Sequence, residues 1–211
     1  PTNVHQPDGV LALPEAGIAV LAAPLTQRHT YDDVTAGFDH LATPPGLLRV
    51  GLAHGSVSGR LPEDIDSANP IAPDRAARAA LDYLALGDWH GCLQIDARTW
   101  YAGTPEPERF RANEPGHVLE VEIDAPGADP VVTRHAVGRY VWTAWQVRLD
   151  VPADVDALAA RLTTLESHHV LSLAVSGHAS LATRARLDDA VGAVAARVRA
   201  IRLDTSELAL E

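Results

Sequence analysis

The sequence contains no lysine, no methionine and only one cysteine, Cys92. A single cysteine excludes a disulfide framework and a cysteine-based zinc site, and it fits a reducing compartment, so we expect a cytoplasmic protein. No apolar run approaches the roughly 18 residues needed to cross a membrane. The first residues have neither the basic nor the apolar stretch of a signal peptide. These absences exclude secreted disulfide scaffolds and membrane-spanning proteins.

Positive charge is scarce. The 17 basic residues are all arginines, and 28 acidic residues bring the net charge to −11. Phosphate neutralisation needs clustered cations, so this balance argues against broad, nonspecific nucleic-acid binding by the chain alone. The charge balance excludes neither acidic metal ligands nor a local basic groove. With 46% hydrophobic and 21% charged residues among 211, the composition is that of a globular protein with one domain, or one domain and a small second one.

The spacing of apolar residues predicts an α/β chain. Short apolar runs bounded by turns are typical of strands, and apolar residues three or four positions apart are typical of helices. We expect strands over residues 10–13, 18–22, 47–53 and 83–86, a hairpin over 92–102, and antiparallel strands over 118–123 and 131–135. We expect helices over 32–41 and 74–81, and a long loop over 56–73.

The pattern changes near Gly138. Beyond it, three predicted strands alternate with two amphipathic helices, an order that can fold as a compact unit. The predicted strands cover residues 140–149, 170–175 and 201–203, and the predicted helices cover 155–165 and 181–198. We therefore expect two domains, residues 1–138 and 139–211.

Two predicted strands end in side chains that can bind a metal ion. His54 follows the first strand, and Asp88 and His90 follow the second, with glycines on either side. Open α/β sheets place their sites at the carboxyl ends of strands. Two imidazoles and a carboxylate suit Mn²⁺, Fe or Zn²⁺ better than Mg²⁺ or Ca²⁺. From the spacing alone, however, a histidine at a strand end is more often a turn residue, and Asp88 is equally suited to an Asx turn.

Three segments resemble the calcineurin-like metallophosphoesterases, most closely the SbcD-like DNA repair exonucleases. They are Tyr-Leu-Ala-Leu-Gly-Asp-Trp-His at 83–90, Leu-Ala-His-Gly at 52–55 and Trp-Tyr-Ala-Gly-Thr-Pro-Glu-Pro at 100–107. Residues 116–123 resemble the strand that follows in that family, so the resemblance covers roughly residues 48–124. It implies a mixed β-sandwich flanked by helices. The tail loosely resembles the family's small α+β capping domain.

The resemblance implies metal-dependent phosphodiester hydrolysis of the DNA exonuclease type, with two divalent ions, Mn²⁺ expected and Fe or Zn²⁺ as alternatives. By motif matching, His54 and Asp88 serve one ion and His90 the other, although the family usually has histidine where Asp88 stands. DNA and a coiled-coil ATPase are the implied partners. Arg60 and Arg109, in neighbouring loops, are candidate phosphate ligands, and a solvated loop position is their commoner interpretation.

The family's amino-terminal motifs are missing from this sequence. Asp-x-His, Gly-Asp and Gly-Asn-His-Asp supply the bridging carboxylate, about half of the ligands and the catalytic histidine in that family. We therefore expect the carboxyl-terminal part of a longer phosphoesterase, inactive alone and with no catalytic residue beyond the metal ligands. Two other functions stay open: a phosphoesterase acting on nucleotides or other small phosphoesters, and a noncatalytic scaffold or partner-binding module.

Overall fold

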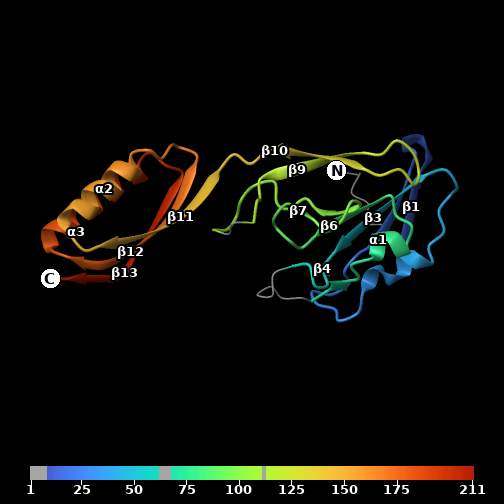
Figure 1. The fold of residues 1–211 in the computed structure, drawn as a ribbon, viewed down its shortest axis with the longest axis horizontal. Coiled ribbons are helices and arrows are strands. Elements are labelled where there is room, and N and C mark those ends of the chain that lie inside the picture. Colours follow the sequence, from blue (N-terminus) through green and yellow to red (C-terminus); the bar gives the residue numbers. More distant parts are fainter. Residues whose placement is uncertain (1–8, 62–67, 111–112) are drawn as a thin grey trace. The chain divides into compact units, whose positions relative to one another are not determined.

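The computed structural model describes residues 9–61, 68–110 and 113–211. Contacts within the chain divide it into two compact units (Figure 1). The first comprises Pro1–Pro105 and Asn113–Val137, and the second comprises Glu106–Ala112 and Gly138–Glu211. The segment from Glu106 thus belongs to the second unit although it precedes residue 138 in the chain.

A six-stranded mixed sheet forms the centre of the first unit. Its order is β1 (Gly9–Leu13), β2 (Ile18–Ala23), β3 (Leu48–His54), β6 (Tyr83–Gly87), β8 (Thr99–Tyr101) and β7 (Leu93–Gln94). The four inner strands run parallel, and β1 and β7 pair antiparallel at the edges. The carboxyl ends of β3 and β6 therefore lie side by side. This architecture confirms the expected α/β class.

The two faces of this sheet are covered differently. One face packs on a 3₁₀ helix, η2 (Val34–Asp39), and on α1 (Arg75–Arg78), and there Leu21 and Leu84 are fully buried. On the other face, Val20 and Val50 stand side by side and only half-buried, and Leu52 is 44% exposed. Among the described residues, the part of this face that belongs to β1, β2 and β3 is left partly open.

An antiparallel hairpin covers the β8 end of that second face. It consists of β9 (His117–Glu122) and β10 (Val131–Ala136), as the alternating sequence predicted. Arg134 of β10 lies over the ring of Trp100, 5.6 Å from its centroid, and Trp100 is buried. Figure 1 shows the hairpin across the sheet from α1. The hairpin is thus a two-stranded second layer over one end of the sheet.

Both helices expected in the first unit are shorter than predicted. The expected helix over 32–41 is the 3₁₀ helix η2, capped by Asp33, whose carboxylate accepts the Thr35 N–H at 2.9 Å. Gly37 within it lowers helix propensity. The expected helix over 74–81 is the single turn α1, after which Ala80 takes a positive φ of 48°.

The expected loop over 56–73 contains two short strands. β4 (Ser56–Val57) and β5 (Pro70–Ile71) pair in parallel. Residues 62–67 of this loop lie outside the described residues. The pairing matters because β4 begins two residues after the end of β3, so it fixes the chain that leaves the sheet.

A buried arginine ties η2 to α1. Arg75 is 2% exposed, and it donates to Asp39 Oδ1 at 2.6 Å and to Asp33 Oδ2 at 2.7 Å. Burial alone raises the pKa of Asp33, but hydrogen bonds from Thr35, Arg75 and the Ala72 N–H outweigh it, so this pKa is lowered. The hydrogen bond from Arg75 lowers the pKa of Asp39. Both carboxylates are therefore held in their charged form.

In the second unit, strands and helices alternate along the chain. They are β11 (Val141–Leu149), α2 (Pro152–Leu162), β12 (His169–Ala179), α3 (Leu181–Ala195) and β13 (Ala200–Leu210). The strands form a parallel sheet in the order β11-β12-β13, and the helices lie side by side along it (Figure 1). Leu149, Leu171 and Leu187 are fully buried in its core. No helix among the described residues is long and apolar enough to span a membrane.

Candidate functional site

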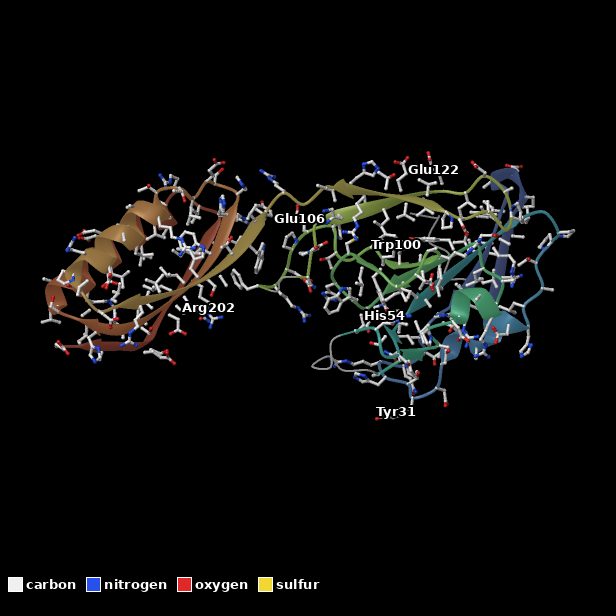
Figure 2. The ribbon with its side chains drawn as sticks, in the orientation of Figure 1. Tyr31, His54, Trp100, Glu106, Glu122 and Arg202 are labelled. Atoms are coloured by element: carbon white, nitrogen blue, oxygen red, sulfur yellow. The ribbon has the colours of Figure 1, made fainter. Side chains whose placement is uncertain are left out.

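The ends of β3 and β6 bring His54 and Asp88 together. His54 is the last residue of β3 and pairs with Gly87 of β6 (Figure 2). Its Nε2 lies 3.4 Å from Asp88 Oδ1. The side chains are 56% and 32% exposed, respectively. Two of the three metal ligands expected from the sequence are thus adjacent, and both can be reached from solvent.

Backbone geometry fixes this pair. A Cβ on Gly87 would come within 2.9 Å of His54 Nδ1, so the absence of a side chain leaves room for the imidazole. Asp88 has a φ of 101°, a conformation that few residues other than glycine adopt. Backbone strain of this kind clusters at functional sites when the surrounding structure holds it in place.

Two further residues support the pair, and neither was singled out in the sequence. Ser56 Oγ donates to Asp88 Oδ2 at 3.0 Å. Tyr101 Oη donates to the Gly55 carbonyl at 2.6 Å and accepts the Val57 N–H at 3.0 Å, so it clamps the turn that follows His54. Burial raises the pKa of Tyr101 to about 12, with the negative charge of Asp88 adding to the rise. Tyr101 therefore stays a neutral donor at any physiological pH.

The sequence indicated Ser56 and Tyr101 only indirectly. Tyr101 lies within the segment 100–107 that carries the family resemblance, and Ser56 stands two residues after His54. A serine that follows a histidine and a glycine is not a recognisable functional motif in a sequence. Its role depends on the turn that brings it back to the end of β6.

His90 lies in the turn beyond β6, and backbone contacts fix its position. Its carbonyl accepts the Thr104 N–H at 3.0 Å. Gly103 makes this approach possible, because a Cβ there would lie 2.6 Å from the Gly91 carbonyl carbon. Among the described residues, no group of three histidine, cysteine, aspartate or glutamate side chains could hold an ion. The described geometry thus groups His54 with Asp88 and does not add His90 to them as a third ligand.

The two candidate phosphate-binding arginines are both on the surface. Arg60 is exposed and follows β4, with its N–H bonded to the Val57 carbonyl at 3.1 Å. Arg109 is 67% exposed, pairs with Glu108 at 3.3 Å and belongs to the second unit. An exposed ion pair such as Arg109–Glu108 contributes little to folding stability and does not fix the arginine in one place. Their assignment as phosphate ligands stays a prediction.

The spacing of His54 and Asp88 fits two ligands of one cation. Ligand atoms bonded to one ion at about 2.0–2.2 Å, with an angle of about 90–110° between them, stand roughly 3.0–3.5 Å apart. The 3.4 Å between His54 Nε2 and Asp88 Oδ1 falls within that range. An imidazole and a carboxylate suit Mn²⁺, Fe or Zn²⁺. Two side chains fill part of a coordination shell, and water or further ligands must fill the rest.

No protein-family model matches the chain, and no curated protein matches it. The residues at the ends of β3 and β6 are therefore the basis for a function. It is supported by the local resemblance of their sequence segments.

Proposed function

We propose that the chain contributes His54 and Asp88 to one cation site of a metal-dependent phosphodiesterase of the DNA exonuclease type. The observation that carries this proposal is the 3.4 Å approach of His54 Nε2 to Asp88 Oδ1 at the carboxyl ends of two adjacent parallel strands. A divalent ion in such a site polarises a phosphate and lowers the pKa of bound water. Mn²⁺ is the ion we expect, with Fe and Zn²⁺ as alternatives.

Each residue has a distinct part in this proposal. His54, as neutral imidazole, offers Nε2, and Asp88 offers Oδ1, both from rigid strand ends. His90, two residues beyond Asp88, is the proposed ligand of a second ion. DNA as substrate and a coiled-coil ATPase as partner stay predictions of the family resemblance.

The open apolar face of the first unit supports a larger site. Residues at alternate positions of β3 share a face, so Leu52 and Val50 lie on the same face as His54. Leu52 is 44% exposed at the centre of the sheet. Proteins normally cover contiguous apolar surface of this kind. We propose that a further β-layer covers it, completes a β-sandwich and brings the remaining metal ligands to the edge where His54 stands.

The test measures Mn²⁺ binding by the whole chain. Binding is detected as a loss of the free-ion signal in electron paramagnetic resonance. We expect weak binding, because an incomplete shell lowers affinity without abolishing it. His54→Ala and Asp88→Asn should each remove it. His135→Ala is the matched control, because His135 Nε2 and Glu120 Oε2 form an exposed pair at 2.7 Å on the hairpin β9–β10. Equal Mn²⁺ binding by wild type and His54→Ala would refute the proposal.

Hydrolysis by the chain gives a second measurement. With Mn²⁺ present, we expect little or no cleavage of phosphodiesters, because two-metal catalysis needs both ions held at once. Robust hydrolysis that is lost in His54→Ala would show that the site is complete within these 211 residues. It would also refute the need for a further layer.

A further inference from the structure

The two oxygens of the Asp88 carboxylate have different surroundings. Oδ2 accepts a hydrogen bond from Ser56 Oγ at 3.0 Å, whereas Oδ1 lies 3.4 Å from His54 Nε2. An ion held beside His54 Nε2 would meet Oδ1, while Oδ2 points to the serine hydroxyl. This asymmetry belongs to the protein itself and exists before any ion binds.

The backbone of Ser56 is held in place by the elements around it. Ser56 is 3% exposed, and its N–H bonds to the Asn69 carbonyl at 2.9 Å where β4 pairs with β5. The next residue, Val57, donates to Tyr101 Oη, and Tyr101 is fully buried. The Ser56 hydroxyl is therefore attached to a backbone that is held in place. A rotation of the carboxylate that turned Oδ2 away from Ser56 and toward an ion would lengthen this hydrogen bond.

The number of oxygens that a carboxylate offers affects which ions it prefers. Ca²⁺ gathers six to eight oxygen ligands and often takes both oxygens of a carboxylate. Ions that accept imidazole, such as Mn²⁺ and Zn²⁺, can take one carboxylate oxygen and one imidazole nitrogen as part of their shell. Groups that hydrogen-bond to metal ligands also orient them and tune affinity.

We propose that Ser56 is a positioning residue that restricts Asp88 to one-oxygen coordination and thereby sets a preference for Mn²⁺-like ions over Ca²⁺. The inference rests on the proposed function and adds to it a determinant of metal selectivity. Ser56 itself touches neither ion nor substrate. It acts through Asp88.

The experiment measures Mn²⁺ and Ca²⁺ affinities of the whole chain, with Ca²⁺ competing against Mn²⁺ in the resonance assay. Ser56→Ala should weaken Mn²⁺ binding on the order of 10-fold, the usual effect of losing such a support. Ca²⁺ affinity should not fall, so the Mn²⁺/Ca²⁺ ratio drops by a similar factor. Ser56→Thr keeps the hydroxyl and should restore the ratio. Ser58→Ala, at an exposed serine two residues on, is the matched control and should behave as wild type.

A merely structural role for Ser56 would change stability and leave the ratio unmoved. Melting temperatures of all variants are therefore recorded. If Ser56→Ala does not fold, Ser56→Gly replaces it, because it also removes the hydroxyl and adds no metal ligand. An unchanged Mn²⁺/Ca²⁺ ratio in the folded variant overturns the inference, while loss of binding in His54→Ala still upholds the proposed function. Wild-type protein that binds no Mn²⁺ overturns both.

Discussion

Arg75→Met removes the buried cation that joins η2 to α1. Two charge-assisted hydrogen bonds disappear, to Asp39 at 2.6 Å and to Asp33 at 2.7 Å. Removing one partner of a buried pair typically costs about 3–5 kcal/mol, because the other charge is left uncompensated. Here Asp33 keeps its hydrogen bonds from Thr35 and the Ala72 N–H, and Asp39 keeps Arg78. We therefore expect the lower end of that range, about 3 kcal/mol.

The effect should depend on pH in a defined direction. The pKa values of Asp33 and Asp39 are lowered in the folded protein, so their contribution to stability is present above their unfolded pKa of about 3.9. It is lost as the pH falls through the lower folded values. Without Arg75 that lowering diminishes, and the buried carboxylates are protonated more readily. The difference in stability between wild type and Arg75→Met should be full above about pH 4 and shrink below it.

Urea unfolding at pH 7, followed by tryptophan fluorescence, measures the loss. Hydrogen exchange shows which unit loses stability. Amides of β6 in the first unit should exchange faster, while those of β12 in the second unit should be unchanged. Arg78→Met is the matched control. Arg78 is 52% exposed and forms one ion pair, with Asp39 at 2.9 Å, so its removal should cost less than about 1 kcal/mol. Equal losses for Arg75→Met and Arg78→Met would refute the reasoning.

Three further predictions concern other parts of the chain. Gly87→Ala should displace the His54 ring and weaken Mn²⁺ binding, with little change in melting temperature. Its control is Gly192→Ala, in open space on α3, which should stabilise the folded protein by about 0.5–1 kcal/mol and leave Mn²⁺ binding unchanged. Leu52→Lys should reduce binding of a hydrophobic dye, because Leu52 lies on the open apolar face; undiminished dye fluorescence would count against that face being exposed. Glu106→Ala removes the carboxylate that accepts the N–H groups of Arg139 and Tyr140, and should lower the unfolding midpoint of the second unit; an unchanged midpoint would contradict this.

In the first unit, strands were easier to predict from the sequence than helices. Each strand of the central sheet that buries its side chains had a visible apolar run, as at 47–53 and 83–86. The helices of the first unit were overestimated, because Val34, Phe38 and Leu41 stand at helical spacing, yet the actual turn is a 3₁₀ helix of six residues. Helical spacing shows which side chains face the core, and it does not separate these two kinds of turn.

The last strand was underestimated for a different reason. The sequence predicted residues 201–203, whereas β13 extends over Ala200–Leu210. Asp204 and Glu207 break the apolar pattern there, but they lie on a sheet where such side chains remain exposed. One face of β13 is exposed to solvent, and its pairing with β12 shifts register between Ala174 and Ser176. Such an irregularity interrupts the alternation of apolar and polar residues by which a strand is predicted from sequence.

For the candidate site, the sequence predicted that His54 and Asp88 lie together, but it did not predict the residues that hold them in place. His54 and Asp88 were expected because strand ends and glycines mark positions where side chains are delivered rigidly. Ser56 and Tyr101 were not, because their hydrogen bonds join residues 32 and 46 positions apart in the chain. Only the folded turn brings them to the same place.

The two units are interleaved along the chain, because Glu106–Ala112 belongs to the second unit. The chain enters the second unit, returns to the first for Asn113–Val137, and leaves it again at Gly138. No single cut of the polypeptide can therefore release either unit whole. A piece beginning at residue 138 would lack the Glu106 carboxylate that binds the Arg139 and Tyr140 amides. Genetic exchange or protease cleavage at that junction should thus yield a frayed first strand instead of an independent module.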